Sequence, residues 1–235
     1  MARRQRVEAE PAYVLHARPW RETSLLLDVL TLEHGRLALV AKGARRPGSQ
    51  LRPVLLTFQP LVLGWSGAGE VRTLTRADWA GGVPLLQGRA LWCGYYLNEL
   101  VLRLLAREDP HREVFLAYDA AVRALSAGEA LSPVLRRFEL AFLTALGYGL
   151  CWPSPSAAGC YRFEPRRGLV PLTEPEETAP GEAILSAETL EDVRAGRWSR
   201  PETLTEVRAL TRRLLDHALD GQELQARRML RELLE

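Results

Sequence analysis

The run from Val40 to Arg46, Val-Ala-Lys-Gly-Ala-Arg-Arg, has the residue types that point most directly to a ligand. Lys42 is the single lysine of the chain, and the other 30 of the 31 basic residues are arginines. A lysine offers a point charge on a flexible stem, whereas an arginine offers a planar fork. Because the run follows a short strand-like segment and contains a glycine, we expect a loop that holds a phosphate backbone. The alternative is that one lysine stands there by chance.

Further cationic and aromatic residues surround this run. Arginine and lysine neutralise phosphates, and an indole ring can stack on a base. Trp20 and Trp65 are candidates for stacking; alternatively, Trp65 belongs to the core and the arginines form a solvated edge that discourages strand pairing. The predicted DNA-binding residues are Trp20, Arg21, Arg36, Lys42, Arg45, Arg46 and Arg52, and Arg18 is close to them in sequence.

The motifs of common enzyme classes are missing from the chain. It has no Gly-x4-Gly-Lys-Ser/Thr phosphate loop and no Gly-x-Ser-x-Gly elbow. Its four histidines are spread through the chain without the spacing of metal ligands. We therefore predict a protein that is not an enzyme. A metal-dependent nuclease is the weaker alternative, with Glu22, Asp28 and Glu33 as its candidate acidic ligands.

Cysteine spacing also argues against a metal site. A structural zinc site normally has four ligands, often from two Cys-x-x-Cys pairs. Cys151 and Cys160 are separated by eight residues, and no further cysteine or histidine follows before His217. We expect no bound metal and no cofactor. Together with Cys93 they are too few for a disulfide framework, so a reducing compartment is expected.

The charge is distributed unevenly along the chain. Residues 1–80 carry 12 basic and 7 acidic side chains, a net charge of +5, and residues 81–235 carry 19 basic and 22 acidic ones, a net charge of −3. This asymmetry is typical of a polyanion-binding part joined to a different body. No apolar run follows the basic N-terminus, and no stretch approaches the ~18 apolar residues of a membrane span. We therefore expect a cytoplasmic protein.

The first 80 residues have the pattern of short strands. Glycine and proline interrupt them, which is typical of a small barrel or sandwich. Five strands suit an OB-fold that binds single-stranded nucleic acid, although SH3-like barrels give the same count. The predicted strands are Ala12–Ala17, Thr23–Leu32, Arg36–Ala41, Leu55–Leu63 and Val71–Ala77.

From Gly82 onwards the apolar residues recur at helical spacing, which predicts a bundle. Residues 147–185 are rich in glycine, proline and acidic residues, and they predict an irregular insertion. The fold class is thus α+β with several domains: an OB-fold at 1–80, a helical domain at 81–150 and 186–235, and an irregular subdomain at 151–185. The predicted helices are 85–107, 111–127, 132–146, 186–195, 200–219 and 223–234.

Three N-terminal segments together resemble the N-terminal domain of bacterial RecO proteins. They are Pro19–Ser24 (Pro-Trp-Arg-Glu-Thr-Ser), Leu32–Leu37 (Leu-Glu-His-Gly-Arg-Leu) and Val40–Arg46, and their order and spacing agree as well. The resemblance continues in Tyr95–Leu100, Arg137–Leu140, Leu146–Tyr148 and the C-terminal segment Gly221–Leu234, so that it covers most of the chain.

The resemblance implies an N-terminal OB-fold, a helical domain and a cysteine-bearing zinc module. The family commonly carries Cys-x-x-Cys twice. This chain keeps Cys160, has Phe163 where the second cysteine would stand, and has Gly168–Leu172 in the region of the later pair. The module could keep its shape through apolar packing of Trp152, Tyr161 and Phe163.

For function, the resemblance implies a mediator of recombinational DNA repair. Such proteins bind single- and double-stranded DNA, anneal complementary strands, work with RecR, and contact the acidic C-terminal tail of single-stranded-DNA-binding protein to help load RecA. Lys42, Arg45 and Arg46 then match the family's basic motif, with Arg21 and Arg36 at neighbouring positions, and a location at the nucleoid would follow.

The acidic tail would need an arginine beside an apolar pocket, for which Arg136, Arg137 and Phe138 are candidates. The alternative function, from a different class, is a protein adaptor whose DNA contact is incidental.

Overall fold

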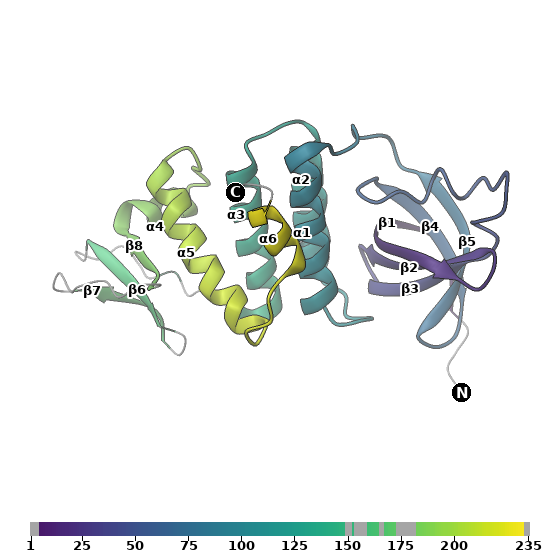
Figure 1. Ribbon diagram of the computed structural model, residues 1–235. Helices are drawn as coiled ribbons and strands as arrows, with labels where there is room; N and C mark the ends of the chain where they lie inside the picture. The colour runs from purple at the N-terminus through teal and green to yellow at the C-terminus, as the bar shows by residue number, and fades with distance from the viewer. Residues whose placement is uncertain (1–4, 149–151, 153–158, 165–166, 173–181, 233–235) are drawn as a thin grey trace. The chain divides into compact units, whose positions relative to one another are not determined.

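The computed structural model describes residues 5–148, 152, 159–164, 167–172 and 182–232. The chain divides into two compact units, Met1–Glu129 with Leu224–Glu235, and Ala130–Glu223. The helices predicted as one domain are shared between these two units, and the predicted domain limits stay a prediction. The fold class, a five-stranded barrel followed by helices, is confirmed (Figure 1).

The elements are β1 (Gln5–Trp20), β2 (Ser24–Thr31), β3 (Gly35–Ala41), β4 (Leu61–Gly67), β5 (Val71–Trp79), α1 (Gly88–Leu104), α2 (Arg112–Ser126), α3 (Leu131–Leu143), the π-helical turn η1 (Thr144–Tyr148), β6 (Cys160–Glu164), β7 (Gly168–Leu172), β8 (Ile184–Ser186), α4 (Ala187–Arg194), α5 (Pro201–Ala218) and α6 (Gln225–Glu232).

Strands β1 to β5 close into a barrel in the order β1-β2-β3-β5-β4. Strands β3 and β5 are parallel, and all other neighbours are antiparallel. Alternate residues of each strand point inward, as the two-residue period of a strand requires. The interior is therefore filled by buried side chains such as Leu27, Val29, Leu37, Leu39 and Trp65. This closed, OB-like core fixes where the loops at the two ends of the barrel lie.

Strand β1 is longer than the sequence pattern predicted. Its first half pairs with β4 from Gln5 to Ala12, and its second half pairs with β2 from Ala12 to Trp20. Two register shifts let the strand bend between its two partners. The sequence pattern did not predict the first half of β1 as a strand, because that half is charged and contains Pro11. Proline and acidic residues are unusual inside strands.

Helices α1 and α2 pack on the outer face of β1 through a buried polar network. The Tyr118 hydroxyl donates to Asn98 Oδ1 at 2.5 Å, and the Asn98 amide donates to the Leu15 carbonyl at 2.7 Å. The Tyr13 hydroxyl donates to Asp119 at 2.6 Å, and its ring lies 5.1 Å from that of Tyr118. Burial raises the pKa of both tyrosines, so both remain protonated donors at physiological pH. The network fixes the two helices to the barrel.

Helix α6 returns to the first unit and is held at its N-terminus by a carboxylate of α1. Glu99 accepts from the backbone N–H groups of Gln225 and Ala226 at 2.9 and 2.8 Å. A carboxylate suits this place because the first N–H groups of a helix have no partner within the helix. Arg103 pairs with the same carboxylate at 2.9 Å.

The second unit combines α3, α4 and α5 with a small sheet of order β7-β6-β8. This sheet lies in the segment predicted to be irregular, and its side chains Tyr161, Phe163 and Leu185 are buried. Trp152 is half-buried. Apolar packing thus shapes the described part of this segment.

A polar cluster joins α4 and α5, and we expect it to make the stability of the second unit depend on pH. Asp192 accepts from the Thr203 hydroxyl at 2.6 Å and from Arg200 and Arg197 at 2.9 Å, and these bonds lower its pKa to about 2. The stabilisation is complete above the ordinary carboxyl pKa of about 4 and is lost as the pH falls from about 4 to about 2. We expect the melting temperature of the native protein to exceed that of Asp192→Asn at pH 6 and to approach it near pH 2. If the difference in melting temperature between the two proteins stayed constant from about pH 6 to about pH 2, the lowered pKa of Asp192 would not be the source of the stabilisation.

Candidate nucleic-acid interface

Two connections meet at one end of the barrel and carry most of the predicted DNA-binding residues. The first is the turn of residues 21–23 between β1 and β2, and the second is the connection 42–60 between β3 and β4. The register pairs Trp20 with Ser24 and Leu25 with Ala41, so the turn and the start of the connection are neighbours. We call this region the basic end of the barrel; it comprises Trp20, Arg21, Lys42, Arg45 and Arg46.

Ala44 anchors the basic run to the barrel. Its side chain is 0 % exposed and belongs to the barrel core, although it lies beyond the end of β3. The chain turns tightly on either side of it, since the Arg46 N–H donates to the Gly43 carbonyl at 3.0 Å and Gly43 has φ +72°. A left-handed residue of this kind is readily supplied by glycine. The residue types of the run thus have distinct roles: alanine inward, glycine at the turn, and the cations outward.

Arg45 joins the two connections. Its backbone N–H donates to the Thr23 carbonyl at 2.8 Å, and its guanidinium donates to the Glu22 carbonyl at 3.3 Å. The guanidinium remains exposed while making this bond. The bond holds the basic run beside the turn, so these cations are on rigid backbone and not on a loose loop.

Lys42 and Arg46 project into solvent from the two sides of Ala44. Both are exposed, and among the described residues no carboxylate lies within ion-pair distance of either side chain. A cation without a neighbouring carboxylate is available to a phosphate, because its charge is not already compensated.

Trp20 is the last residue of β1, and Arg21 is the first residue of the facing turn. Trp20 is 38 % exposed, so one part of its indole is available for stacking. Arg21 has φ +52°, a left-handed conformation that costs an L-residue roughly 1–2 kcal/mol. Because glycine adopts this conformation without strain, replacement by glycine can test whether the Arg21 side chain has a role apart from stability.

This position allows charge and stability to be separated. Arg21→Gly is expected to leave the free energy of unfolding within about 1 kcal/mol of the native value, because relief of the left-handed strain offsets glycine's entropy. Its affinity for single-stranded DNA is expected to fall about fivefold at ~0.1 M salt, the effect of one lost phosphate contact. Thermal unfolding and a fluorescence titration measure the two quantities. Arg21→Lys, which keeps the charge, is the control, and an unchanged affinity in Arg21→Gly would refute the contact.

Arg52 belongs to the later part of the connection 42–60. It is exposed and lies within a turn in which the Leu55 N–H donates to the Leu51 carbonyl at 3.0 Å. Leu51, at the start of this turn, packs against the barrel core. The strand predicted at 55–63 begins only at Leu61. Leu55 is buried, but it belongs to this turn, so its apolar side chain did not mark the start of a strand.

Arg36 lies at the opposite end of β3 from Lys42. Its side chain is 14 % exposed; its Nε donates to the Leu105 carbonyl at 3.0 Å, and its Nη1 lies 3.7 Å from Asp28. Burial lowers the pKa of the Arg36 guanidinium. Arg36 and the basic run are close in sequence, but they lie at opposite ends of β3. Contact between Arg36 and DNA therefore stays a prediction.

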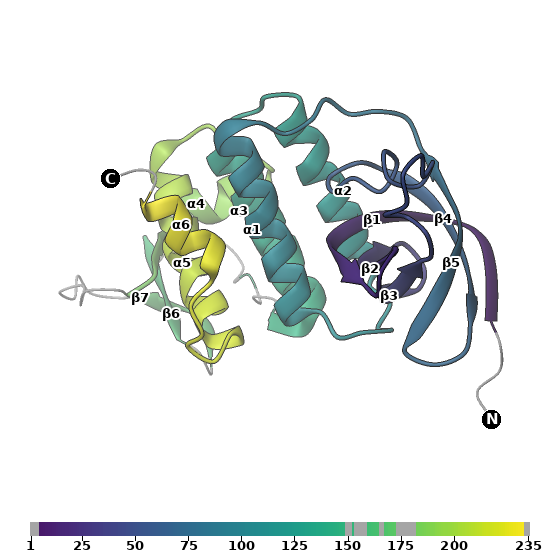
Figure 2. The ribbon, with the colours of Figure 1, turned by 45° about the vertical axis from the view of Figure 1, so that its right-hand side comes forward.

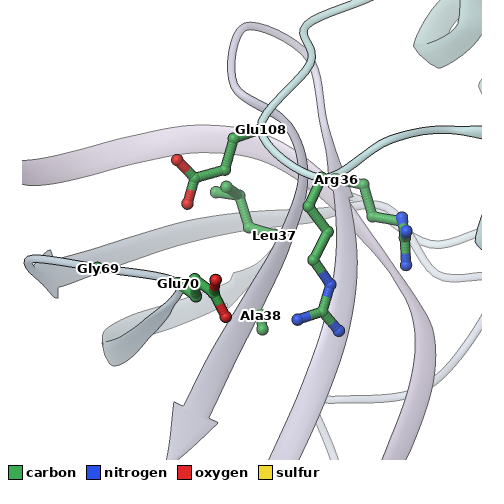
Figure 3. Close-up of a pocket in the computed structure, with 7 residues that line it drawn as sticks. Arg36, Leu37, Ala38, Gly69, Glu70 and Glu108 are labelled. Atoms are coloured by element: carbon green, nitrogen blue, oxygen red, sulfur yellow. The ribbon is translucent and has the colours of Figure 1, made fainter.

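A pocket of about 410 Å³ adjoins Arg36 at this other end (Figure 3). Its walls carry Arg107 together with Glu70 and Glu108, and Figure 3 shows both glutamates among the residues that line the pocket with Arg36. Arg107 is engaged with Asp28 at 2.9 Å. Mixed charge of this kind does not favour a polyanion, so the basic end remains the better candidate.

Trp65 does not serve as a stacking residue. It is 0 % exposed and fills the barrel interior, where its ring lies edge-on to His34 at 5.2 Å. The core interpretation is therefore correct for this residue. A different tryptophan, Trp79, is exposed; the sequence pattern missed it because the last strand was predicted to end at Ala77.

The three residues considered for an acidic peptide differ in accessibility. Arg136 and Phe138 are buried, and Arg136 donates to Glu139 at 2.6 Å while Phe138 stacks on Phe142. Arg137 is exposed on α3. Of the three, only Arg137 presents its side chain at the surface, and the peptide site stays a prediction.

No group of three or more histidine, cysteine, aspartate or glutamate side chains able to hold a metal ion lies within the described ranges. Cys160 is exposed and has no disulfide partner among them, and Cys151 lies outside those ranges. Two of the candidate nuclease ligands are engaged by arginines: Asp28 pairs with Arg36 and Arg107, and Glu33 pairs with Arg112. Within the same ranges, no helix is both long and apolar enough to cross a membrane.

Comparison with known proteins gives matches over nearly the whole chain. The family model for the N-terminal part of recombination protein O matches residues 6–83, and the model for its C-terminal part matches residues 85–228. A DNA repair protein RecO from Azoarcus sp. strain BH72 is 52 % identical over 242 residues, covering 100 % of both chains. The DNA repair proteins RecO of Aromatoleum aromaticum and Nitrosospira multiformis are 51 % and 44 % identical, covering 100 % and 97 % of both chains.

Proposed function

The chain belongs to the RecO family of DNA repair proteins, and on that premise we propose that it is a non-enzymatic recombination mediator that binds DNA through the basic end of its barrel. A role in DNA repair and recombination follows from family membership. The binding mode is supported by one observation in particular: Lys42, Arg45 and Arg46 project from a turn that Ala44 anchors in the barrel core.

Binding at this site is electrostatic and indifferent to sequence. Phosphates carry no base information, and the basic end offers charges and not a set of base-reading amides. Both single- and double-stranded DNA present phosphates, so both are expected ligands. Annealing follows if two complementary strands share one basic surface that screens their mutual repulsion. Arg21 is the remaining cation of the basic end, and Trp20 supplies a ring for stacking. The exposed Arg52, further along the connection 42–60, is a further candidate for phosphate contact.

A salt titration tests this proposal. Purified protein is titrated into labelled single- and double-stranded oligonucleotides at several salt concentrations, and the annealing rate of complementary strands is followed in parallel. We expect the logarithm of the binding constant to fall linearly with the logarithm of salt concentration. Absence of binding at moderate salt would favour the alternative of a protein adaptor. Strand cleavage on addition of magnesium would overturn the non-enzymatic assignment.

The family's protein partners are proposed on weaker grounds. RecR, RecA loading and the acidic tail of single-stranded-DNA-binding protein are inferred from membership alone. For the tail, Arg137 is the exposed cation of the predicted set, whereas Arg136 is buried. Titration of a tail peptide against Arg137→Glu tests this part separately, and unchanged peptide affinity would refute a role for Arg137.

A further inference from the structure

Trp79, the last residue of β5, lies at the mouth of the barrel. It pairs with Leu61 of β4, which is buried in the barrel core. Ala77, two residues earlier on the same face, packs against that core. Trp79 is on the same inward face of β5, yet it is 61 % exposed. It is exposed because it lies beyond the last buried residues of the barrel core. The indole is thus placed over the end of the barrel and not on its side.

The indole is held in a fixed position. Its Nε1–H donates to Gln59 Oε1 at 3.2 Å, and the Gln59 amide donates to the Val83 carbonyl at 3.2 Å. Gln59 is only 2 % exposed, so this anchor is rigid. The ring also lies against Gly82, where a Cβ atom would come within 2.8 Å of Cζ2. Two independent contacts therefore hold a large aromatic ring whose remaining surface faces water.

This position is at the same end of the barrel as the basic run. Strands β3 and β5 are parallel, with Val40 opposite Thr73, so both end in the same direction. The connection 42–60 starts at Lys42 and leads to Leu61, the partner of Trp79, and the Ala80 N–H donates to the Pro60 carbonyl at 2.9 Å. Figure 2 shows this connection at the end from which the chain leaves β5 for α1. One connection thus links the basic run to the exposed indole.

We propose that Trp79 is a stacking platform for a base of single-stranded DNA whose phosphates contact Lys42, Arg45 and Arg46. This inference rests on the proposed function, and it adds that the site distinguishes single from double strands. Every base has a π face, but in a duplex that face is covered by its neighbours, and only an unstacked base can lie on the indole. A ring that is already fixed loses little side-chain entropy on binding.

The test compares Trp79→Leu, which keeps an apolar side chain, with Trp79→Phe, which keeps an aromatic ring. The probes are an oligothymidylate of about 20 nucleotides, an abasic oligomer of equal length and a duplex. We expect Trp79→Leu to bind the oligothymidylate about tenfold more weakly and Trp79→Phe to recover most of the loss. Affinity for the abasic oligomer and the duplex, and the salt dependence, should change little, since no phosphate contact is removed.

The outcomes separate this inference from the proposed function. If the native protein binds none of the three probes, the proposed function fails. If the native protein binds them and Trp79→Leu keeps its affinity for oligothymidylate, stacking at Trp79 is refuted while phosphate binding stands. An equal loss on the abasic oligomer would also refute it, because the abasic oligomer has no base to stack. Thermal unfolding of both variants checks that the barrel is intact.

Discussion

Charge reversal at Lys42, Arg45 and Arg46 together is expected to weaken binding to single-stranded DNA about 100-fold at ~0.1 M salt. Each phosphate contact contributes roughly 0.7 to the slope of the logarithm of the binding constant against the logarithm of salt concentration for a single strand. Three lost contacts lower that slope by about 2, which is a factor of about 100 at this salt concentration. Repulsion by the new carboxylates adds to the loss. Fluorescence anisotropy at several salt concentrations measures affinity and slope together.

The control must change the net charge equally at another place. Arg208, Arg212 and Arg213 lie on the exposed face of α5 in the second unit, and their reversal changes the net charge by the same amount. A local interface predicts a small effect there. An equal loss in both triple variants would show that overall charge, and not the basic end, governs binding.

A second variant addresses folding. Arg45 donates to the Glu22 carbonyl, so its replacement disturbs the backbone as well as the charge. Lys42→Glu with Arg46→Glu leaves that bond in place, and a slope reduction of about 1.4 is then expected. Unchanged affinity and slope in a folded triple variant would refute the interface.

The sequence predicted the barrel because its physical signals are local. Short apolar runs, a glycine turn at Gly35 and prolines between strands each depend on neighbouring residues. The same holds for the basic run, whose loop character follows from Gly43 and its cations. The inward alanine could not be predicted, because whether Ala44 enters the core depends on how β2 and β3 close around it.

The errors and omissions concern long-range arrangement. Trp65 and Trp79 are both aromatic residues in strands, and only the closure of the barrel determines that one is buried and the other stands at its mouth. Arg36 and Lys42 are close in sequence, but strand β3 separates them along its length. Its six residues of separation correspond to roughly 20 Å. Charge clustering in sequence therefore overstates clustering in space whenever a strand intervenes.

Arg36 allows a direct test of this distinction between proximity in sequence and proximity in space. Arg36→Met is expected to lower the free energy of unfolding by about 2 kcal/mol, because it leaves the Leu105 carbonyl without this donor and the half-buried Asp28 with one cation fewer. Arg107, which is more exposed, still pairs with Asp28 and limits the loss. Arg107→Gln is accordingly expected to cost less than 1 kcal/mol, about the value of an exposed ion pair. Chemical denaturation measures both.

DNA binding by the same variant decides between the two roles of Arg36. If Arg36 supports the junction between β3 and the end of α1, Arg36→Met changes affinity less than twofold and leaves the salt slope intact under conditions where it is folded. If Arg36 contacts phosphate as the sequence predicted, the slope falls by about 0.7, as it does for any single cation of the interface. The measurement matters beyond this residue: a bound strand that reaches Arg36 must run along the outer faces of β2 and β3, whereas one that does not reach it is confined to the loops that join Lys42 to Trp79.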